Sequence, residues 1–560
     1  MLPLFKQLPN FAREIFDSRS RMPAKLTTKF MSIMLIAATT WLTPVAAADS
    51  SGNGTDQRYD LFRIASQHLF TYDQISMPAN DEPMGLLGLL YTVELPLALY
   101  SGAGIFGGLT GNQGGLFTLG IEAGINLHIH QHWRFRAGYY FGGGGGKVGT
   151  GDGLMTRYYY GFSYISGKVG GGIHYSDIAF PDSEIHGRQI GLSLEIPIGV
   201  TLASPNYMNA EVPRLSLVNL NGRPPLGFQQ FTLALVQQNY FQRQGTLDIS
   251  GLPQDGILRL LGFEISRSFN DHYFLRLKLA GAYSGIHHGY MDIIGGFGYQ
   301  SDYLFHLIAL TARLNLGLGG GGHVETGGGF LAGLDGGLKI RLGPLLRLQF
   351  SGGFISSPDG NLRAASFTAQ LGYRIDLGLG TQKATTVSTS PMFKFSGWSV
   401  RLSDQVYDKP QRKITMKSDD VHLVGVKIDR LVNHYLYLTG QGLFAYSGEH
   451  VGGLAVGLVG TGLQHRPLLD ERINLFGEIL VGAAGGGHLT LGGGAITQTM
   501  VGADIHINSS VALRLATGEV VALKDELDSQ VLDIGIVFRF SLLTRKITRR
   551  NLESAFHKEW

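Results

Sequence analysis

The sequence contains one pattern of residues three times in the same order, and such a triplication constrains the fold more than any other feature. GFEISRSFNDHYFLRLKLAGAYSG at 262–285 aligns without a gap to GVKIDRLVNHYLYLTGQGLFAYSG at 425–448. A more diverged copy precedes both, with its own Tyr-Ser-Gly triplet beginning at Tyr100. The predicted copies, which we treat as structural repeats, are 58–198, 228–378 and 395–540.

Within each copy, apolar and polar residues alternate. In FLRLKLAG, Leu275, Leu277 and Leu279 are separated by Arg276 and Lys278, and TARLNLGL and LRLQF follow the same rule. Successive side chains of a β-strand point to opposite faces, so each segment has one apolar and one polar face. We expect about eight such strands per copy, separated by turn residues such as Ser-Pro-Asp-Gly at 357–360.

The composition supports a sheet structure and excludes several classes. Gly accounts for 81 of 560 residues without a triplet period, so the chain is glycine-rich but not collagen-like. A net charge of +3 with scattered basic residues argues against binding of nucleic acid. The absence of cysteine excludes a disulfide framework, thiolate metal sites and a lipoprotein anchor.

An export signal is expected at the beginning of the chain. MSIMLIAATTWLTPVAAA at 31–48 follows Lys25 and Lys29 and ends in an A-x-A cleavage pattern. We predict a signal peptide over 1–48; the alternative is an uncleaved membrane helix, which Thr39, Thr40 and Pro44 would interrupt.

After residue 48, no apolar run reaches the ~18 residues that a spanning helix requires. We therefore predict an all-β fold, a transmembrane antiparallel β-barrel of about 24 strands from three eight-stranded repeats. The alternative is three linked eight-stranded barrels. The polar linkers 199–227 and 379–394 favour separate barrels, whereas the first copy looks shortened before Tyr100, and a continuous sheet tolerates a short strand. On balance the sequence favours one barrel.

These features resemble those of Gram-negative outer-membrane β-barrel proteins as a class. VLDIGIVFRF at 531–540 is similar to the aromatic-ended terminal strand of that class, although a basic tail, 541–560, follows it here. The resemblance implies transmembrane β-strands in the cell outer membrane. It also implies outer-membrane lipid, lipopolysaccharide and the barrel-insertion machinery as partners. It identifies no specific family.

A glycine motif is the most distinctive local signal. Three glycines precede a basic or titratable residue in each copy, and a second glycine cluster follows. Its residues are Gly320, Gly321, Gly322 and His323, then Gly485, Gly486, Gly487 and His488, with Lys147 in the first copy. No helix follows that would make a phosphate-binding loop. A steric role in a bend or a close backbone approach is expected, and the alternative is a binding site at a lumen or mouth.

Other chemistry is weakly indicated. His128, His130 and His132 are spaced to share one strand face and are weak metal candidates, but no acidic residue lies among them. No G-x-S-x-G or H-E-x-x-H string occurs, so no enzyme and no cofactor are expected.

Basic residues in the predicted strands of the second copy suggest a function. The main lumen candidates are Arg276, Lys278, Arg313 and Arg347, and Lys339, Arg341 and Arg374 share the pattern. Among strand residues of this copy, only Glu264 and Asp335 are counted as acidic. We expect a porin-like passive channel or export conduit that favours anions. The alternative is a structural or surface-binding protein with a closed lumen, and the solute or exported polymer is not encoded in any motif.

Overall fold

The computed structural model describes residues 59–78, 81–146, 151–212, 218–219, 228–254, 256–284, 289–378, 393–412, 419–465, 472–524 and 526–545. All of them belong to one compact unit that spans 47–560. The expected signal peptide, Lys147 and the last part of the expected tail, 546–560, lie outside the described residues. No helix in the described part of the chain is long and apolar enough to cross a membrane.

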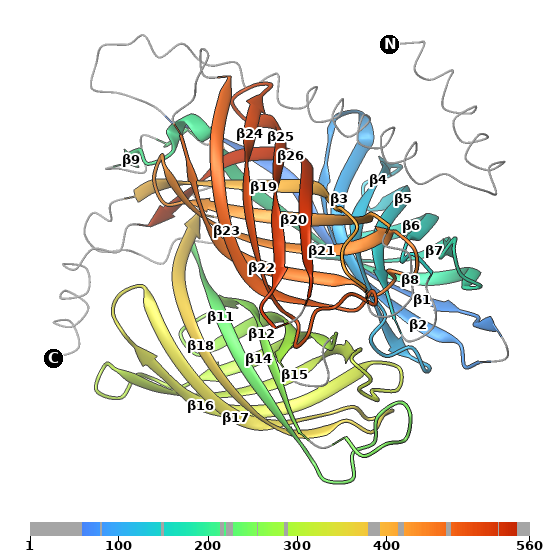
Figure 1. Cartoon of the computed structure of the whole chain (residues 1–560). Coiled ribbons are helices and arrows are strands. Elements are labelled where there is room, and N and C mark those ends of the chain that lie inside the picture. Colours follow the sequence, from blue (N-terminus) through green and yellow to red (C-terminus); the bar gives the residue numbers. More distant parts are fainter. Residues whose placement is uncertain are drawn as a thin grey trace, which may run out of the picture. The chain divides into compact units, whose positions relative to one another are not determined.

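Three groups of strands follow one another along the chain (Figure 1). The first comprises β1 (Tyr59–Ile75), β2 (Met84–Glu94), β3 (Leu99–Thr110), β4 (Phe117–His128), β5 (Trp133–Gly145), β6 (Met155–Ser166), β7 (Val169–Ala179) and β8 (His186–Ala203). The second comprises β11 (Phe228–Gln242), β12 (Ile257–Ser268), β13 (Tyr273–Ser284), β14 (Met291–Gln300), β15 (Ile308–Gly320), β16 (Phe330–Arg341), β17 (Leu346–Ser356) and β18 (Arg363–Gly378). The third comprises β19 (Phe393–Tyr407), β20 (Val421–Leu431), β21 (Leu436–Ser447), β22 (Ala455–Gln464), β23 (Ile473–Gly485), β24 (Ala495–His506), β25 (Val511–Ala522) and β26 (Asp528–Arg545).

Short elements lie before β3 and between the first two groups. They are the single-turn 3-10 helices η2 (Pro96–Ala98) and η3 (Pro205–Tyr207) and the two-residue strands β9 (Glu211–Val212) and β10 (Val218–Asn219). Strand β10 makes a parallel pairing with β1, and β9 pairs with β19.

Each group of eight strands closes on itself. The first strand of each group pairs antiparallel with the last: β1 with β8, β11 with β18, and β19 with β26. Eight antiparallel strands per copy are therefore confirmed. The favoured single barrel of about 24 strands is wrong, because the described residues form three separately closed eight-stranded barrels, the stated alternative.

The reason lies in the first and last strands of each copy. β1 and β2 both precede Tyr100, so the first copy is complete and not shortened as its divergent sequence suggested. In the third copy, β19 and β26 pair along their full lengths, from Phe393 with Arg545 to Tyr407 with Val531. Strand β26 therefore continues through 541–545, so the first five residues of the predicted tail belong to the barrel. A sheet in lipid cannot tolerate an unpaired strand edge, because its amide and carbonyl groups would have no hydrogen-bond partner. Closure of each copy leaves no such edge.

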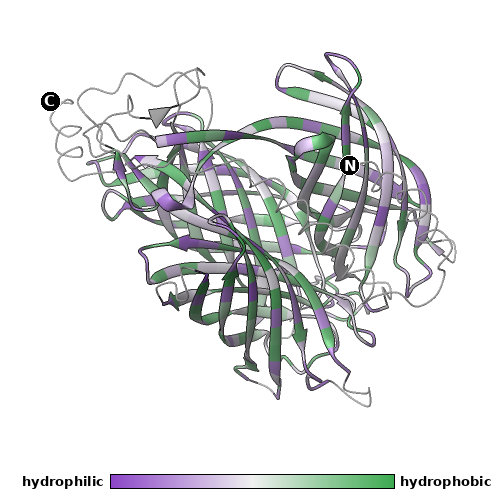
Figure 2. Cartoon of the chain, turned by 90° about the horizontal axis from the view of Figure 1, so that it is seen from above, coloured by the Kyte–Doolittle hydropathy of each residue, from purple (hydrophilic) through white to green (hydrophobic). Residues whose placement is uncertain are grey.

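Hydrophilic and hydrophobic residues alternate along the strands, as Figure 2 shows. Because successive side chains of a strand point to opposite sides, this alternation gives each barrel one polar and one apolar face. In β13, the side chains of Arg276 and Lys278 are buried inside the barrel, whereas Leu275, which precedes Arg276, is 47% exposed on the outside. The same pattern holds in β15, where Arg313 is buried and Leu314 is exposed. Polar interiors and apolar exteriors are the reverse of a soluble barrel and match a barrel in lipid.

The two ends of each barrel differ. Because eight is an even number, the chain enters and leaves each barrel at one end, which we call the terminal end. Turns there are tight, as at 269–272 and 342–345, whereas the opposite loop end carries longer connections such as 243–256 and 408–420. In outer-membrane barrels, short turns face the periplasm and longer loops face outward.

Independent closure predicts that one copy folds alone. Residues 393–545 expressed without the rest of the chain should insert into outer-membrane-like vesicles, become protease-resistant and show heat-modifiable gel mobility. The physical reason is that every strand of β19–β26 finds both neighbours within the fragment. A fragment that stays protease-sensitive in the presence of lipid would contradict independent closure.

Candidate functional site

The lumen of the first barrel is filled by a buried ion-pair network. The Arg157 guanidinium lies 3.3 Å from the Asp73 carboxylate and 3.8 Å from Glu122, and all three side chains are 0% exposed. The hydroxyls of Tyr100 and Tyr159 donate to Glu122 at 3.0 and 2.9 Å. These groups come from β1, β3, β4 and β6, so they cross the whole lumen and exclude a continuous water path at this level.

The second lumen contains two buried clusters of charges. Arg276 and Arg313 both pair with Glu264, and Arg313 also pairs with Asp335. The ammonium of Lys278 lies 2.9 Å from the carboxylate of Asp292.

Three of the four main lumen candidates are thus each paired with a carboxylate. The expectation that Glu264 and Asp335 are the only acidic strand residues of this copy is wrong. Asp292 and Asp376 also lie in strands, and both are buried. The fourth candidate, Arg347, faces the terminal end of the lumen and donates to the carbonyl of Gly343 at 2.6 Å.

The third barrel repeats this solution with different residues. Arg401 and Arg514 lie 3.0 and 2.7 Å from the same carboxylate oxygen of Glu478. Lys427 pairs with Asp533, whose other contacts are hydrogen bonds from side chains of β19. In all three barrels, these central buried charges are therefore matched by opposite charges, as their desolvation requires.

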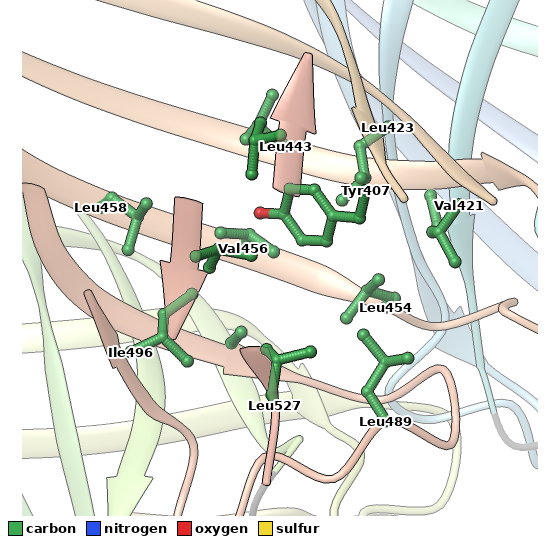
Figure 3. Packing of buried hydrophobic residues seen from close by; sticks show 14 of the residues in the cluster. Tyr407, Val421, Leu423, Leu443, Leu454, Val456, Leu458, Leu489, Ile496 and Leu527 are labelled. Carbon is green, nitrogen blue, oxygen red and sulfur yellow. The ribbon is translucent and has the colours of Figure 1, made fainter. Parts of the chain in front are cut away.

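Toward the loop end, each lumen is sealed by apolar side chains. Figure 3 shows the seal of the third barrel, where Tyr407, Leu423, Leu443 and Leu458 from strands meet Leu489 from the loop after β23. Equivalent buried clusters fill the loop ends of the first and second barrels. Each lumen is thus blocked twice, first by a dry apolar layer and then by ion pairs.

The glycine motif of each copy contacts a loop of another copy at the loop end. The amide of Gly114 in the first copy donates to the carbonyl of Gly327 in the second at 2.7 Å. The amide of Gly452 in the third copy donates to Gly151 of the first at 3.0 Å. Between the second and third copies, Gly289 lies against Gly485 and Gly486. The loop before the fourth strand of each copy therefore contacts the glycine motif of another copy, and the contacts close into a ring of three.

Close backbone approach explains the glycines. The last glycine of each motif faces a carbonyl oxygen of another copy, Gly153 with Ala445, Gly329 with Gly108 and Gly494 with Ala282. A side chain at these positions would overlap that oxygen. The steric role favoured for the motif is supported by these contacts, but the glycine-lined ring also encloses space.

A cavity of about 550 Å³ lies where these loops meet, and we call it the axial cavity. Glycine backbones form most of its wall, and the other lining residues are Ile249, His323, Val324, His450, His488 and Leu489. Its volume is in the range of small-molecule sites. Ile249 and His450, which the sequence analysis did not identify, come from loops of the second and third copies. The one signal in the sequence for a shared site is the identical order of motifs in all three copies.

The three histidines of the axial cavity have unusual backbones. His323, His450 and His488 have φ angles of 66°, 53° and 55°, in the left-handed region that non-glycine residues rarely occupy. The backbone amide of His450 donates to the Asp152 carboxylate at 3.1 Å, and partial burial raises the pKa of that carboxyl above its ordinary value. All three histidines are exposed at the loop end, where Nδ1 of the His488 ring lies 3.2 Å from the carbonyl oxygen of His450.

The candidate histidines of the first copy do not share a strand face. Only His128 belongs to β4, while His130 and His132 lie in the turn 129–132, where the His132 ring is 3.0 Å from the carbonyl of Ile165. In the described ranges, no three His, Cys, Asp or Glu side chains are grouped so that they could hold a metal ion.

The exterior of the barrels identifies their environment. Large apolar side chains cover the outer faces of all three barrels, among them Ile190, Leu192, Leu310, Phe354, Ile479 and Val501. A closed sheet that exposes leucine and buries arginine is stable in hydrocarbon and not in water. The three barrels are therefore transmembrane β-barrels, as the sequence predicted.

Neither a protein-family model nor a curated protein matches the chain. Among solved structures, the siderophore receptor PirA from Pseudomonas aeruginosa is 10% identical, with a TM-score of 0.25, over 87% of this chain and 81% of that chain. OpdQ from Pseudomonas aeruginosa is 8% identical, with a TM-score of 0.19, over 86% of this chain and 97% of that chain. OccAB4 from Acinetobacter baumannii is 8% identical, with a TM-score of 0.19, over 87% of this chain and all of that chain. Scores this low carry no argument about architecture or activity.

The contact ring predicts a steric penalty at Gly485. A methyl group there would overlap the backbone of Gly289, so Gly485→Ala should lower the free energy of unfolding by about 1–3 kcal/mol. Gly457→Ala in the same barrel is the control, because a Cβ there meets no atom within 4 Å. Denaturant unfolding in lipid vesicles measures both, and equal effects would remove the steric explanation.

The ion pairs predict a large effect at Asp533. Asp533→Ala leaves Lys427 buried without a counter-charge and should cost about 3–5 kcal/mol of unfolding free energy. The double variant Asp533→Ala/Lys427→Met removes both charges and should recover most of that loss. If the single variant unfolds at the wild-type denaturant concentration, the lumen at this level is hydrated and the claim of a dry seal fails.

Proposed function

We propose that the protein is a non-conducting outer-membrane protein that acts through a binding surface at its loop end. The observation that carries this proposal is the filling of all three lumens. A water-filled pore would leave its lining accessible, but Arg157, Lys278 and Lys427 are at most 1% exposed. Eight-stranded barrels are narrow enough for side chains to fill them, whereas channels need more strands. This favours the closed-lumen alternative over the porin-like channel.

The loop end offers the surface. The axial cavity lies there, and the loops around it are rich in carboxylates with few basic residues. The described acidic loop residues are Asp81, Glu82, Asp152, Asp182, Glu184, Asp248, Glu325, Asp359, Asp408, Asp419, Asp420, Glu449 and Glu526. The basic ones are Arg243, Lys409, Arg412 and Lys524. A negative field at this face favours neutral or cationic ligands over the anions expected for a channel.

Two further partners belong to this proposal. Lipopolysaccharide would contact the apolar exterior near the loop end, since this end faces outward in our assignment. The barrel-insertion machinery would engage β26, which closes the third barrel by pairing with β19. Both expectations follow from the resemblance to outer-membrane barrels and from the position of β26 at the closing seam.

Planar-bilayer recording tests whether the lumens are closed. The wild-type protein should show no stable single-channel steps, because both the apolar seal and the ion pairs obstruct ions. Heat-modifiable mobility and protease protection of the same preparation serve as the control that the protein has inserted.

Stable steps from inserted wild-type protein would overturn the proposal and restore the channel. In that case, reversal potentials in a salt gradient should show anion preference, and Arg313→Gln/Arg347→Gln should weaken it. Steps with unchanged selectivity in that variant would exclude the second lumen as the path.

A further inference from the structure

The terminal end of the second lumen carries a concentration of positive charge. Lys339 and Arg341 of β16, Arg347 of β17 and Arg374 of β18 all occupy inward-facing strand positions. We call these four residues the basic cluster. They lie beyond the paired Arg313 and face the opening at which the chain enters and leaves the barrel.

The two central arginines are placed against each other. Arg341 and Arg347 are direct cross-strand partners of the β16–β17 pair. Like charges at such positions destabilise a sheet. Arg347 uses its guanidinium to bind carbonyls of the turn 343–346. Arg341 stacks on the Tyr303 ring at 4.0 Å, and its Nε is buried without a hydrogen-bond partner.

The cluster is not neutralised by neighbouring carboxylates. Arg374 donates two hydrogen bonds of 3.1 Å to the carboxylate of Asp376. Among the described strand residues, Asp376 is the one acidic residue that faces the lumen at this end, and it is thus already paired. Lys339 donates to the amide oxygen of Gln300 at 2.8 Å. Among the described residues, no ion pair includes Lys339, Arg341 or Arg347. These three positive charges therefore have no described carboxylate within ion-pair distance, in contrast with the paired charges deeper in the lumen.

The other barrels lack this arrangement. The cross-strand pair that corresponds to Arg341 and Arg347 is His506 with Ala512 in the third barrel, and Ile165 with Gly170 in the first. Closure of a barrel therefore does not require two arginines at this pair. The repulsion between Arg341 and Arg347 is therefore peculiar to the second barrel, and the eight-stranded fold does not require it.

We propose that the basic cluster binds the phosphate group of a soluble anion. A phosphate carries a charge of about −1.5 to −2 at pH 7, which matches several cations better than one carboxylate does. The guanidinium of Arg341 and the ammonium of Lys339 retain donors for its oxygens. Because these groups face the lumen, the barrel wall separates them from lipid headgroups around the barrel. This site is independent of the loop-end surface and of whether the lumens conduct.

Isothermal titration of the full-length protein in neutral detergent at low ionic strength tests the site, with inorganic phosphate and pyrophosphate as probes. The wild type should bind saturably at one site per chain. Lys339→Gln and Arg341→Gln should each weaken binding about tenfold or more, since each removes a charge-assisted hydrogen bond. Acetate should bind much more weakly than phosphate.

Thermal melting keeps the result interpretable if titration heats are small. Pyrophosphate should raise the melting temperature of the wild type and leave that of Arg341→Gln unchanged. Without ligand, Arg341→Gln should melt at or above the temperature of the wild type, because the substitution relieves the repulsion between Arg341 and Arg347. Arg539→Gln is the matched control, since this arginine faces the terminal end of the third barrel. Absence of saturable binding by the wild type, or an equal loss in Arg539→Gln, would overturn the proposal.

Discussion

Hydrogen bonding between the first and last strand of each copy is the constraint on which the rest of the structure depends. In lipid, an unpaired strand edge exposes amide and carbonyl groups that no solvent can satisfy. The β1–β8, β11–β18 and β19–β26 seams remove every such edge within a single copy. Because each copy is complete, its closure needs no strand from a linker. The described linker residues pair only over short stretches, such as β9 with β19 and β10 with β1.

Closure at eight strands then dictates what the lumens contain. A narrow barrel has no room for a column of water, so its inward-facing residues must satisfy one another. The polar face that alternation produces is rich in arginine, lysine and carboxylates, and burial of these charges is tolerable only in pairs. Glu264 with Arg276, and Glu478 with Arg514, are two local solutions to this requirement. The basic cluster near Arg341 departs from the rule, which is why it points to an external anion.

The three closed barrels are joined where their glycine loops approach. Glycine at positions such as Gly153 and Gly494 lets backbones of different copies touch, and the repeated geometry closes into a ring because each copy offers the same two surfaces. Outward-facing Phe117, Leu318 and Phe444 pack together just below this ring and are buried there, although equivalent faces elsewhere meet lipid. The axial cavity is a consequence of this ring and belongs to no single copy.

The sequence by itself determined the strand pattern, the eight-stranded copies and the apolar exterior, because alternation with a period of two and the threefold order of landmarks are local properties. It also located the turns and the inward direction of Arg276, Lys278 and Arg313. Only the tertiary structure decided which strands close each barrel, since the pairing of β1 with β8 or with a strand of another copy leaves the same pattern in the sequence. Strand register also decided that Asp292 pairs with Lys278 and that Arg341 lies opposite Arg347. The contacts of the glycine motifs join segments that are far apart in the chain. Residue order alone encodes neither the register nor these contacts.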